Sequence, residues 1–234
     1  MPYAWSCDTT TAERLASAAP PWKHDAMRIA FFLYEGLTTL DILGPHDVLS
    51  RLPDCEAISV GKTKGPFTAD TGALGLTSTH TIDDVDAVDI LVVPGGLEGT
   101  FAAAADPETT DWVRSVSAGA TWTTSVCTGS LILGAAGLLE GKRATTHWAA
   151  IDALAGYGAT PIDDERVVFD GDIVTAAGVS SGIDMALTLA ARVVDDDFAK
   201  ALQLAIEYDP QPPFDTGSRQ KAGDEIAALV AGVF

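Results

Sequence analysis

The ten residues 121–130 read TWTTSVCTGS, and this stretch constrains the fold more than any other part of the chain. Its first half is rich in β-branched and aromatic residues, which favour a strand. Gly129 then opens an apolar run that continues to Leu139 and has the composition of a helix. A strand, a bend that carries Cys127 and a helix, in this order, are typical of a nucleophile elbow. The stretch therefore predicts an α/β fold with one cysteine on a sharp turn.

The position of Cys127 at the start of a helix predicts an activated thiol. Unpaired N–H groups and the partial positive charge of a helix N-terminus favour the thiolate over the thiol. We therefore expect the pKa of Cys127 to lie below that of a free cysteine. We also expect a positive φ at this bend, which is unusual for a residue other than glycine. The alternative is a buried structural cysteine, because free cysteine is among the most buried residue types.

The rest of the chain alternates apolar strands with helices. Strands are predicted at 27–34, 56–61, 88–93, 121–126 and 142–146, with short strands at 65–81 and a hairpin at 165–176 around Asp170-Gly171. Helices are predicted at 38–52 with an interruption at Gly44-Pro45, and at 107–119, 148–155, 180–194 with a Ser180 or Ser181 cap, and 197–208. This alternation implies a doubly wound, mostly parallel sheet with helices on both faces.

No linker divides the alternating region, so we expect a single domain at 27–218. An extension at 1–26 precedes it, and a tail at 219–234 follows as a loosely attached helix without a helix-turn-helix motif.

Composition and charge exclude several classes of protein. The 234 residues are 47% hydrophobic, which is ample for one large core, but no apolar run is long enough to span a membrane. The net charge of −19 repels nucleic acid and anionic membranes. The first 26 residues lack the apolar stretch of a secretory signal. Cys7, Cys55 and Cys127 have no CxxC spacing, which argues against a disulfide framework and zinc. We therefore expect a cytoplasmic protein.

Three features are expected at one edge of the sheet, because ligands bind outside the carboxyl ends of parallel strands. Asp41 follows the first strand, Gly95-Gly96 follow the strand at 88–93, and Cys127 ends the strand at 121–126. Asp41 lies in an apolar run, so burial and a neighbouring thiolate would raise its pKa and allow it to transfer protons. Alternatively, Asp41 caps a helix or accepts a backbone N–H.

Other residues at this edge are candidates for substrate binding. Gly96 has no side chain, so its N–H can approach a substrate and stabilise negative charge together with the N–H of Thr128. Alternatively, Gly95 and Gly96 only form a turn. His147 follows a strand at the same edge, where it either reaches the pocket or serves as a packing and hydrogen-bonding residue.

These segments resemble the DJ-1/PfpI superfamily and, within it, the isocyanide hydratases. The resemblance covers about residues 27–218 and rests on LDILGPHDVL (40–49), VPGG (93–96), TSVCTGSLILGAAGLL (124–139), RATTHW (143–148), GIDMAL (182–187) and EYDPQPPF (207–214). It implies a flavodoxin-like fold, a homodimer, neither cofactor nor metal, and Cys127 as the nucleophile with Asp41 beside it. Aspartate at 41 and threonine at 128 count against the protease branch, which has glutamate and histidine there.

The resemblance also implies a reaction. An isocyanide would be hydrated to an N-substituted formamide through a thioimidate on Cys127, and Asp41 would transfer the protons. Gly96 and Thr128 would stabilise developing charge, and Val179 would close the apolar side of the pocket. Two alternatives stay open: a glyoxalase- or deglycase-like activity on small carbonyls, and a non-enzymatic redox or ligand sensor that uses the same thiol.

Overall fold

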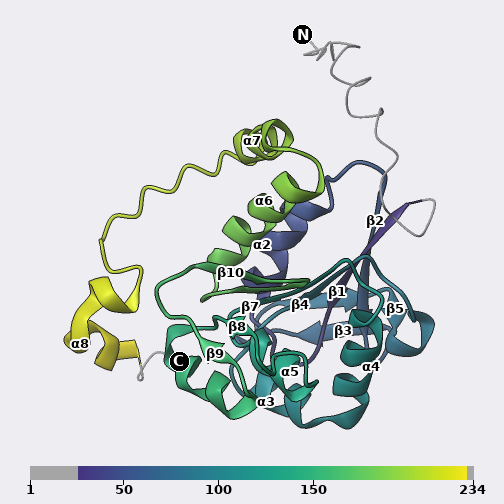
Figure 1. Ribbon diagram of the computed structural model, residues 1–234, viewed down its shortest axis with the longest axis horizontal. Helices are drawn as coiled ribbons and strands as arrows, with labels where there is room; N and C mark the ends of the chain where they lie inside the picture. The colour runs from purple at the N-terminus through teal and green to yellow at the C-terminus, as the bar shows by residue number, and fades with distance from the viewer. Residues whose placement is uncertain (1–25, 231–234) are drawn as a thin grey trace.

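The computed structural model describes residues 26–230, and its centre is a seven-stranded sheet with helices on both faces (Figure 1). The strand order is β10-β11-β7-β6-β1-β2-β5, and every neighbouring pair is parallel except β10 with β11. The strands are β1 (Met27–Phe32), β2 (Cys55–Gly61), β5 (His80–Thr81), β6 (Ile90–Val93), β7 (Trp122–Val126), β10 (Val167–Asp170) and β11 (Ile173–Ala176). The prediction of a single flavodoxin-like, mostly parallel α/β fold is confirmed. Almost all of the expected extension 1–26, with Cys7 and His24, lies outside the described residues.

Two helical layers sandwich the sheet (Figure 1). One layer holds α2 (Thr39–Leu49), α6 (Ser181–Val193) and α7 (Asp196–Ala205), and the other holds α3 (Glu98–Ala105), α4 (Pro107–Ser117) and α5 (Gly129–Ala135). The central strands contribute fully buried side chains to both layers, among them Ile29, Phe32, Ile90 and Leu91. Each such side chain contributes about 1.5–3 kcal/mol to folding, so the core fixes the positions of the strand ends.

Short elements surround the main sheet. The hairpin of β3 (Gly65–Thr68) and β4 (Gly75–Ser78) confirms the strands expected at 65–81, and β10 with β11 confirms the hairpin expected at 165–176. The remaining elements are β8 (Arg143–Ala144), β9 (Thr160–Pro161) and the 3₁₀ segments η1 (Ile82–Asp84) and η2 (Trp148–Tyr157).

Three local predictions need correction. Helix α2 runs through Gly44-Pro45 without interruption, because these residues pack against α6: a Cβ at Gly44 would press on Ile183, and Pro45 lies against Gly182. Helix α3 was not predicted, since its alanine-rich sequence has no clear apolar stripe. No serine side chain caps α6, because the hydroxyl of Ser181 donates instead to the carbonyl of Ala177, at 2.6 Å.

Helix α8 (Arg219–Val230) lies apart from the two layers, at the end of the long segment 206–218 (yellow in Figure 1). None of its residues is buried, and Gly223, with φ of 71°, divides it by a kink. A helix was expected at 219–234, of which residues 231–234 lie outside the described part of the chain. No helix between residues 26 and 230 combines the length and the apolar character that crossing a membrane requires.

Candidate active site

The carboxyl ends of four neighbouring strands meet at one edge of the sheet. After β1 the chain continues to β2 on one side of the sheet, and after β6 it continues to β7 on the other side. This edge therefore contains the topological switch point, where such folds bind ligands. The register pairs Val93 with Ser125 and Val126 with Ala176, which places the segments that follow β6, β7 and β11 next to one another. The predicted convergence of Asp41, Gly95-Gly96 and Cys127 therefore occurs.

The backbone at Cys127 has φ of 56°, which confirms the predicted strained bend. Its N–H donates to the carbonyls of Ala176 and Ala177, at 3.1 and 3.0 Å, and its carbonyl accepts the hydroxyl of Thr146 at 2.9 Å. Gly129 lets α5 approach β6 so closely that a Cβ there would collide with the carbonyl oxygen of Val93. These contacts from three directions hold the cysteine in a conformation that an isolated chain would avoid.

Asp41 lies in the first turn of α2 and is fully buried. Its Oδ2 accepts the N–H of Gly95 at 2.9 Å. Acceptance of a backbone N–H was one of the alternatives that the sequence left open for Asp41. It is not the helix cap, because Thr38 occupies that position. Its second oxygen, Oδ1, has no hydrogen-bond partner among the described residues, although the thiol of Cys127 lies close enough to lower the pKa of the carboxyl group. One oxygen is thus structural and the other is free for chemistry.

Burial governs the protonation of both groups. It raises the pKa of Asp41 to about 7, against the lowering effects of the Gly95 N–H and the Cys127 thiol. Burial, and secondly the charge of Asp41, raise the pKa of Cys127 to about 12. The prediction that the pKa of Cys127 lies below that of a free cysteine is therefore wrong. The helix N-terminus cannot offset the loss of water and an adjacent carboxylate, so the resting pair is a thiol beside a carboxyl group that titrates near neutrality.

Two backbone donors act on the sulfur. The N–H groups of Thr128 and Val179 both lower the pKa of Cys127, although less than burial raises it. Donors in this position also stabilise negative charge that develops on or beside the sulfur. Gly96 is placed differently: its N–H donates to the hydroxyl of Thr128 at 3.1 Å, while its carbonyl accepts that hydroxyl at 2.8 Å.

A buried network behind this loop was not predicted from the sequence. Thr100 donates to the carbonyl of Gly96 at 2.8 Å and lies 2.9 Å from the hydroxyl of Thr128. Tyr34 donates to the carbonyl of Pro94 at 2.9 Å and lies 3.0 Å from the hydroxyl of Thr100. Burial raises the pKa of Tyr34 well above its ordinary value, so it stays neutral and positions the loop. The only sequence signal was the place of Tyr34 at the end of the strand predicted at 27–34.

A cavity of about 320 Å³ opens above the sulfur. Gly96, Cys127 and Thr128 lie along it, Val179 closes one side as expected, and apolar groups form most of the remaining wall: Leu97, Phe101, Trp148, Ala149, Ala150, Ala227 and Val230. The cavity thus suits an apolar ligand that presents one reactive atom to the sulfur.

His147 also lines this cavity, which answers the question left open by the sequence. Its Nδ1 accepts the N–H of Ala149 at 3.3 Å, and its ring packs where a Cβ on Gly178 would lie. Burial lowers its pKa below the ordinary value, so the ring is neutral at pH 7. The residue therefore reaches the pocket and at the same time serves the packing role.

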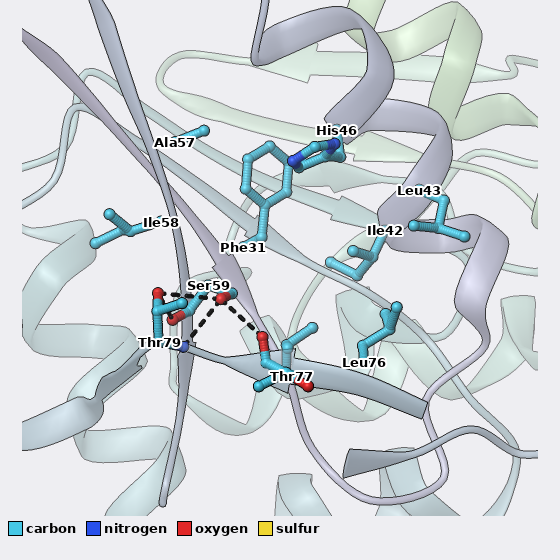
Figure 2. A pocket seen from close by; sticks show the side chains of 11 residues that line it. Phe31, Ile42, Leu43, His46, Ala57, Ile58, Ser59, Leu76, Thr77 and Thr79 are labelled. Carbon is cyan, nitrogen blue, oxygen red and sulfur yellow. Dashed lines mark hydrogen bonds between the residues drawn. The ribbon is translucent and has the colours of Figure 1, made fainter. Parts of the chain in front are cut away.

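Another cavity, of about 240 Å³, lies between α2 and strands β2 and β4 (Figure 2). The rings of Phe31 and His46 contact each other at its upper edge, tilted by 58° and with centroids 5.0 Å apart. At its lower edge, Ser59 donates to the carbonyl of Thr77 at 3.0 Å and lies 3.2 Å from the hydroxyl of Thr79. Its hydroxyl groups bond to one another, and neither a cysteine nor a carboxylate is among the residues that line it. The cavity above Cys127 contains the cysteine of the elbow and is the candidate active site.

No group of three or more His, Cys, Asp or Glu side chains between residues 26 and 230 is arranged to hold a metal ion.

Comparisons with known proteins give the family of this chain. The DJ-1/PfpI family model matches residues 27–192. The isonitrile hydratase of Pseudomonas putida is 50% identical over 201 residues, which cover 86% of this chain and 87% of that protein. A ThiJ/PfpI family protein of Pseudomonas syringae superposes with a TM-score of 0.85 at 42% identity, over 92% of this chain and 88% of the other. Drosophila melanogaster DJ-1beta, with a TM-score of 0.70 at 20% identity over 78% of this chain and 98% of the other, shares the fold. The chain belongs to the DJ-1/PfpI family.

Proposed function

We propose that this chain hydrates isocyanides to N-substituted formamides. The observation that carries the proposal is the pairing of Cys127, which lines an apolar cavity, with the buried carboxyl group of Asp41, whose pKa lies near 7. The likeness to the isonitrile hydratase of Pseudomonas putida supports the same substrate class. An isocyanide fits the chemistry, because its terminal carbon accepts a nucleophile and its N-substituent can occupy an apolar wall.

The first half of the reaction forms a covalent adduct. The Asp41 carboxylate removes the thiol proton as the sulfur of Cys127 attacks the terminal isocyanide carbon. Asp41 then gives that proton to the same carbon, which yields a thioimidate in which sulfur, hydrogen and nitrogen are bonded to carbon. A pKa near 7 suits a group that must take and return one proton at neutral pH.

The second half consumes water. A water molecule adds across the carbon–nitrogen double bond, so that oxygen bonds to carbon and a proton goes to nitrogen. The tetrahedral adduct then collapses, the carbon–sulfur bond breaks, and the hydroxyl proton returns through Asp41 to the sulfur. The N–H groups of Thr128 and Val179 stabilise the charge that develops beside the sulfur, and the Gly96 N–H contributes when it exchanges its Thr128 partner for substrate.

The reaction as written needs neither metal nor organic cofactor, and we expect activity to survive exhaustive dialysis against a chelator. We also propose that the active form is a homodimer in the cytoplasm. Light scattering coupled to gel filtration would give twice the 24.3 kDa chain mass if this is correct.

A small panel of substrates tests the proposal. The purified protein is assayed with cyclohexyl isocyanide and with methylglyoxal, and products are identified by NMR. We expect the N-substituted formamide from the former and slow or no turnover of the latter. Turnover of methylglyoxal alone would favour the small-carbonyl alternative. Turnover of neither, combined with rapid oxidation of Cys127 by peroxide, would favour a sensor, although the 6% exposure of this residue and its raised pKa count against one.

A further inference from the structure

The cavity above Cys127 has an outer wall that comes from the other end of the chain. Its inner part is formed by the loops after β6 and β7, whereas Ala227 and Val230 of α8 line it from outside. In Figure 1, α8 lies at the end of a long segment, away from both helical layers. A helix that is not part of the core thus contributes to the walls of the candidate active site.

The orientation of α8 explains which of its residues reach the cavity. Ala227 and Val230 are three positions apart, so they share one face of the helix, and both are half-buried. Ala228 and Leu229 belong to the opposite face and are exposed.

The kink at Gly223, where φ is 71°, sets the direction of the second half of α8. The first half is fastened to the domain by Gln220, whose side-chain amide donates to the carbonyl of Asp163 at 2.9 Å.

We infer that Ala227 and Val230 determine the largest N-substituent that the site accepts. This inference rests on the proposed function and deepens it. Ala227 contributes one methyl group, so any larger side chain there would occupy the apolar space opposite the sulfur. Val230 lies one turn further along the same face, so its size adjusts the depth of the same wall. The groups that react, Asp41 and Cys127, belong to other elements and do not depend on either residue.

The matched pair Ala227→Phe and Ala228→Phe tests the inference, because both changes add the same group to adjacent positions of one helix. The Ala227→Phe variant should lower kcat/KM for cyclohexyl isocyanide by about 10–200-fold, the range for a change in pocket size, and that for methyl isocyanide by less than about 3-fold. The Ala228→Phe variant should leave both values near those of the unmodified protein. Val230→Ala should have the opposite effect: it should raise kcat/KM for cyclohexyl isocyanide relative to kcat/KM for methyl isocyanide.

A second readout keeps this test independent of hydratase activity. The rate of alkylation of Cys127 is measured by peptide mass spectrometry with iodoacetamide and with a bulky N-substituted iodoacetamide, and Cys55, which lies at the start of β2, serves as the internal reference. Ala227→Phe should slow the bulky reagent selectively. If isocyanides are not hydrated but this selectivity appears, the wall is correct and the proposed function is wrong. In each assay the preference for the small over the bulky compound is compared between the variants. If this preference is the same in Ala227→Phe and Ala228→Phe in both assays, the inference is overturned.

Discussion

The two sides of the active-site cavity are built in opposite ways. On the inner side, Asp41 and Ser130 are fully buried, and the backbone at Cys127 is held by hydrogen bonds from two other segments. On the outer side, α8 has no buried residue and only a few polar contacts to the domain. The reacting groups thus depend on the core, whereas the outer wall can change without loss of the fold. In the proposed account, the buried side of the cavity carries out the reaction, and α8 on the exposed side limits the size of the substrate.

The two described cysteines give the largest expected effect on activity. Cys127→Ala removes the nucleophile, so isocyanide turnover should fall on the order of 10⁴–10⁶-fold, as when other covalent nucleophiles are removed. Cys55→Ala is the matched control, because Cys55 is half-buried on β2, away from the cavity above Cys127, and its thiol donates to the carbonyls of Leu49 and Ser50. Its activity should stay within about 2-fold. Comparable losses in both variants would mean that the cavity above Cys127 is not the reaction site.

Asp41→Asn should lower turnover by about 10²–10⁴-fold, the usual contribution of a general acid–base group. The asparagine oxygen can still accept the Gly95 N–H at the position where Asp41 now does so at 2.9 Å, so the fold should survive. Asp41→Glu should also be impaired, because misplacing a reacting group by ~1 Å can cost ~10²-fold. Steady-state assays of all three proteins give the comparison. Full activity in Asp41→Asn would contradict a role of Asp41 in proton transfer and would leave it only the hydrogen bond from the Gly95 N–H.

The inner and outer sides should also differ in their tolerance of small changes. Gly129→Ala places a Cβ against the carbonyl oxygens of Val93 and Pro94, whereas Gly217→Ala meets no atom within 4 Å. We expect Gly129→Ala to lower the free energy of unfolding by about 2–4 kcal/mol and Gly217→Ala to change it by less than about 0.5 kcal/mol. Urea denaturation measures both values. If the two variants have similar free energies of unfolding, the backbone around Cys127 can adjust to the added Cβ. The close packing of α5 on β6 would then not be what fixes its conformation.

The pH dependence of activity and of stability should have opposite signs. Because the carboxylate of Asp41 must accept the thiol proton, kcat/KM should rise with pH and level off above a pKa of about 7. Stability should change in the other direction. The pKa of Asp41 is raised from 3.8 in the unfolded chain to about 7 in the fold, so its contribution to stability is complete below pH 3.8 and is lost as pH rises to about 7.

The difference between Asp41→Asn and the unmodified protein isolates this contribution. The variant should be the more stable of the two at pH 8 by about 4 kcal/mol, and the advantage should nearly vanish by pH 4. Urea denaturation at several pH values provides the data. An advantage that does not change with pH would show that Asp41 is ionised in the fold throughout this range.

The fold and the inner side of the site could be read from the sequence because both depend on local patterns. Apolar strands alternating with helices fix the parallel sheet, and parallel strands bring Asp41, Gly96 and Cys127 to one edge whatever lies between them. The interruption expected at Gly44-Pro45 did not occur, because packing against α6 outweighs the local preference of proline.

The remaining features depend on contacts that no local pattern encodes. Ala227 and Val230 lie about a hundred residues from Cys127, and nothing in their neighbourhood marks them as part of a pocket. Burial has the largest effect on the pKa of Cys127, and its extent at this position was not visible in the sequence, whereas the neighbouring Asp41 was. Patterns therefore brought the proposed reacting groups together, whereas the structure was needed for their protonation and for the outer wall of the cavity.

The covalent role of Cys127 is tested most directly by mass spectrometry during a single turnover. The protein is mixed with an equal amount of cyclohexyl isocyanide, quenched at successive times and digested. The proposed mechanism predicts a transient increase in the mass of the peptide that contains Cys127, equal to one isocyanide without water. Its decay should match the rate at which the formamide appears. Formamide production without an adduct on this peptide, or unchanged production by Cys127→Ala, would contradict the proposed reaction.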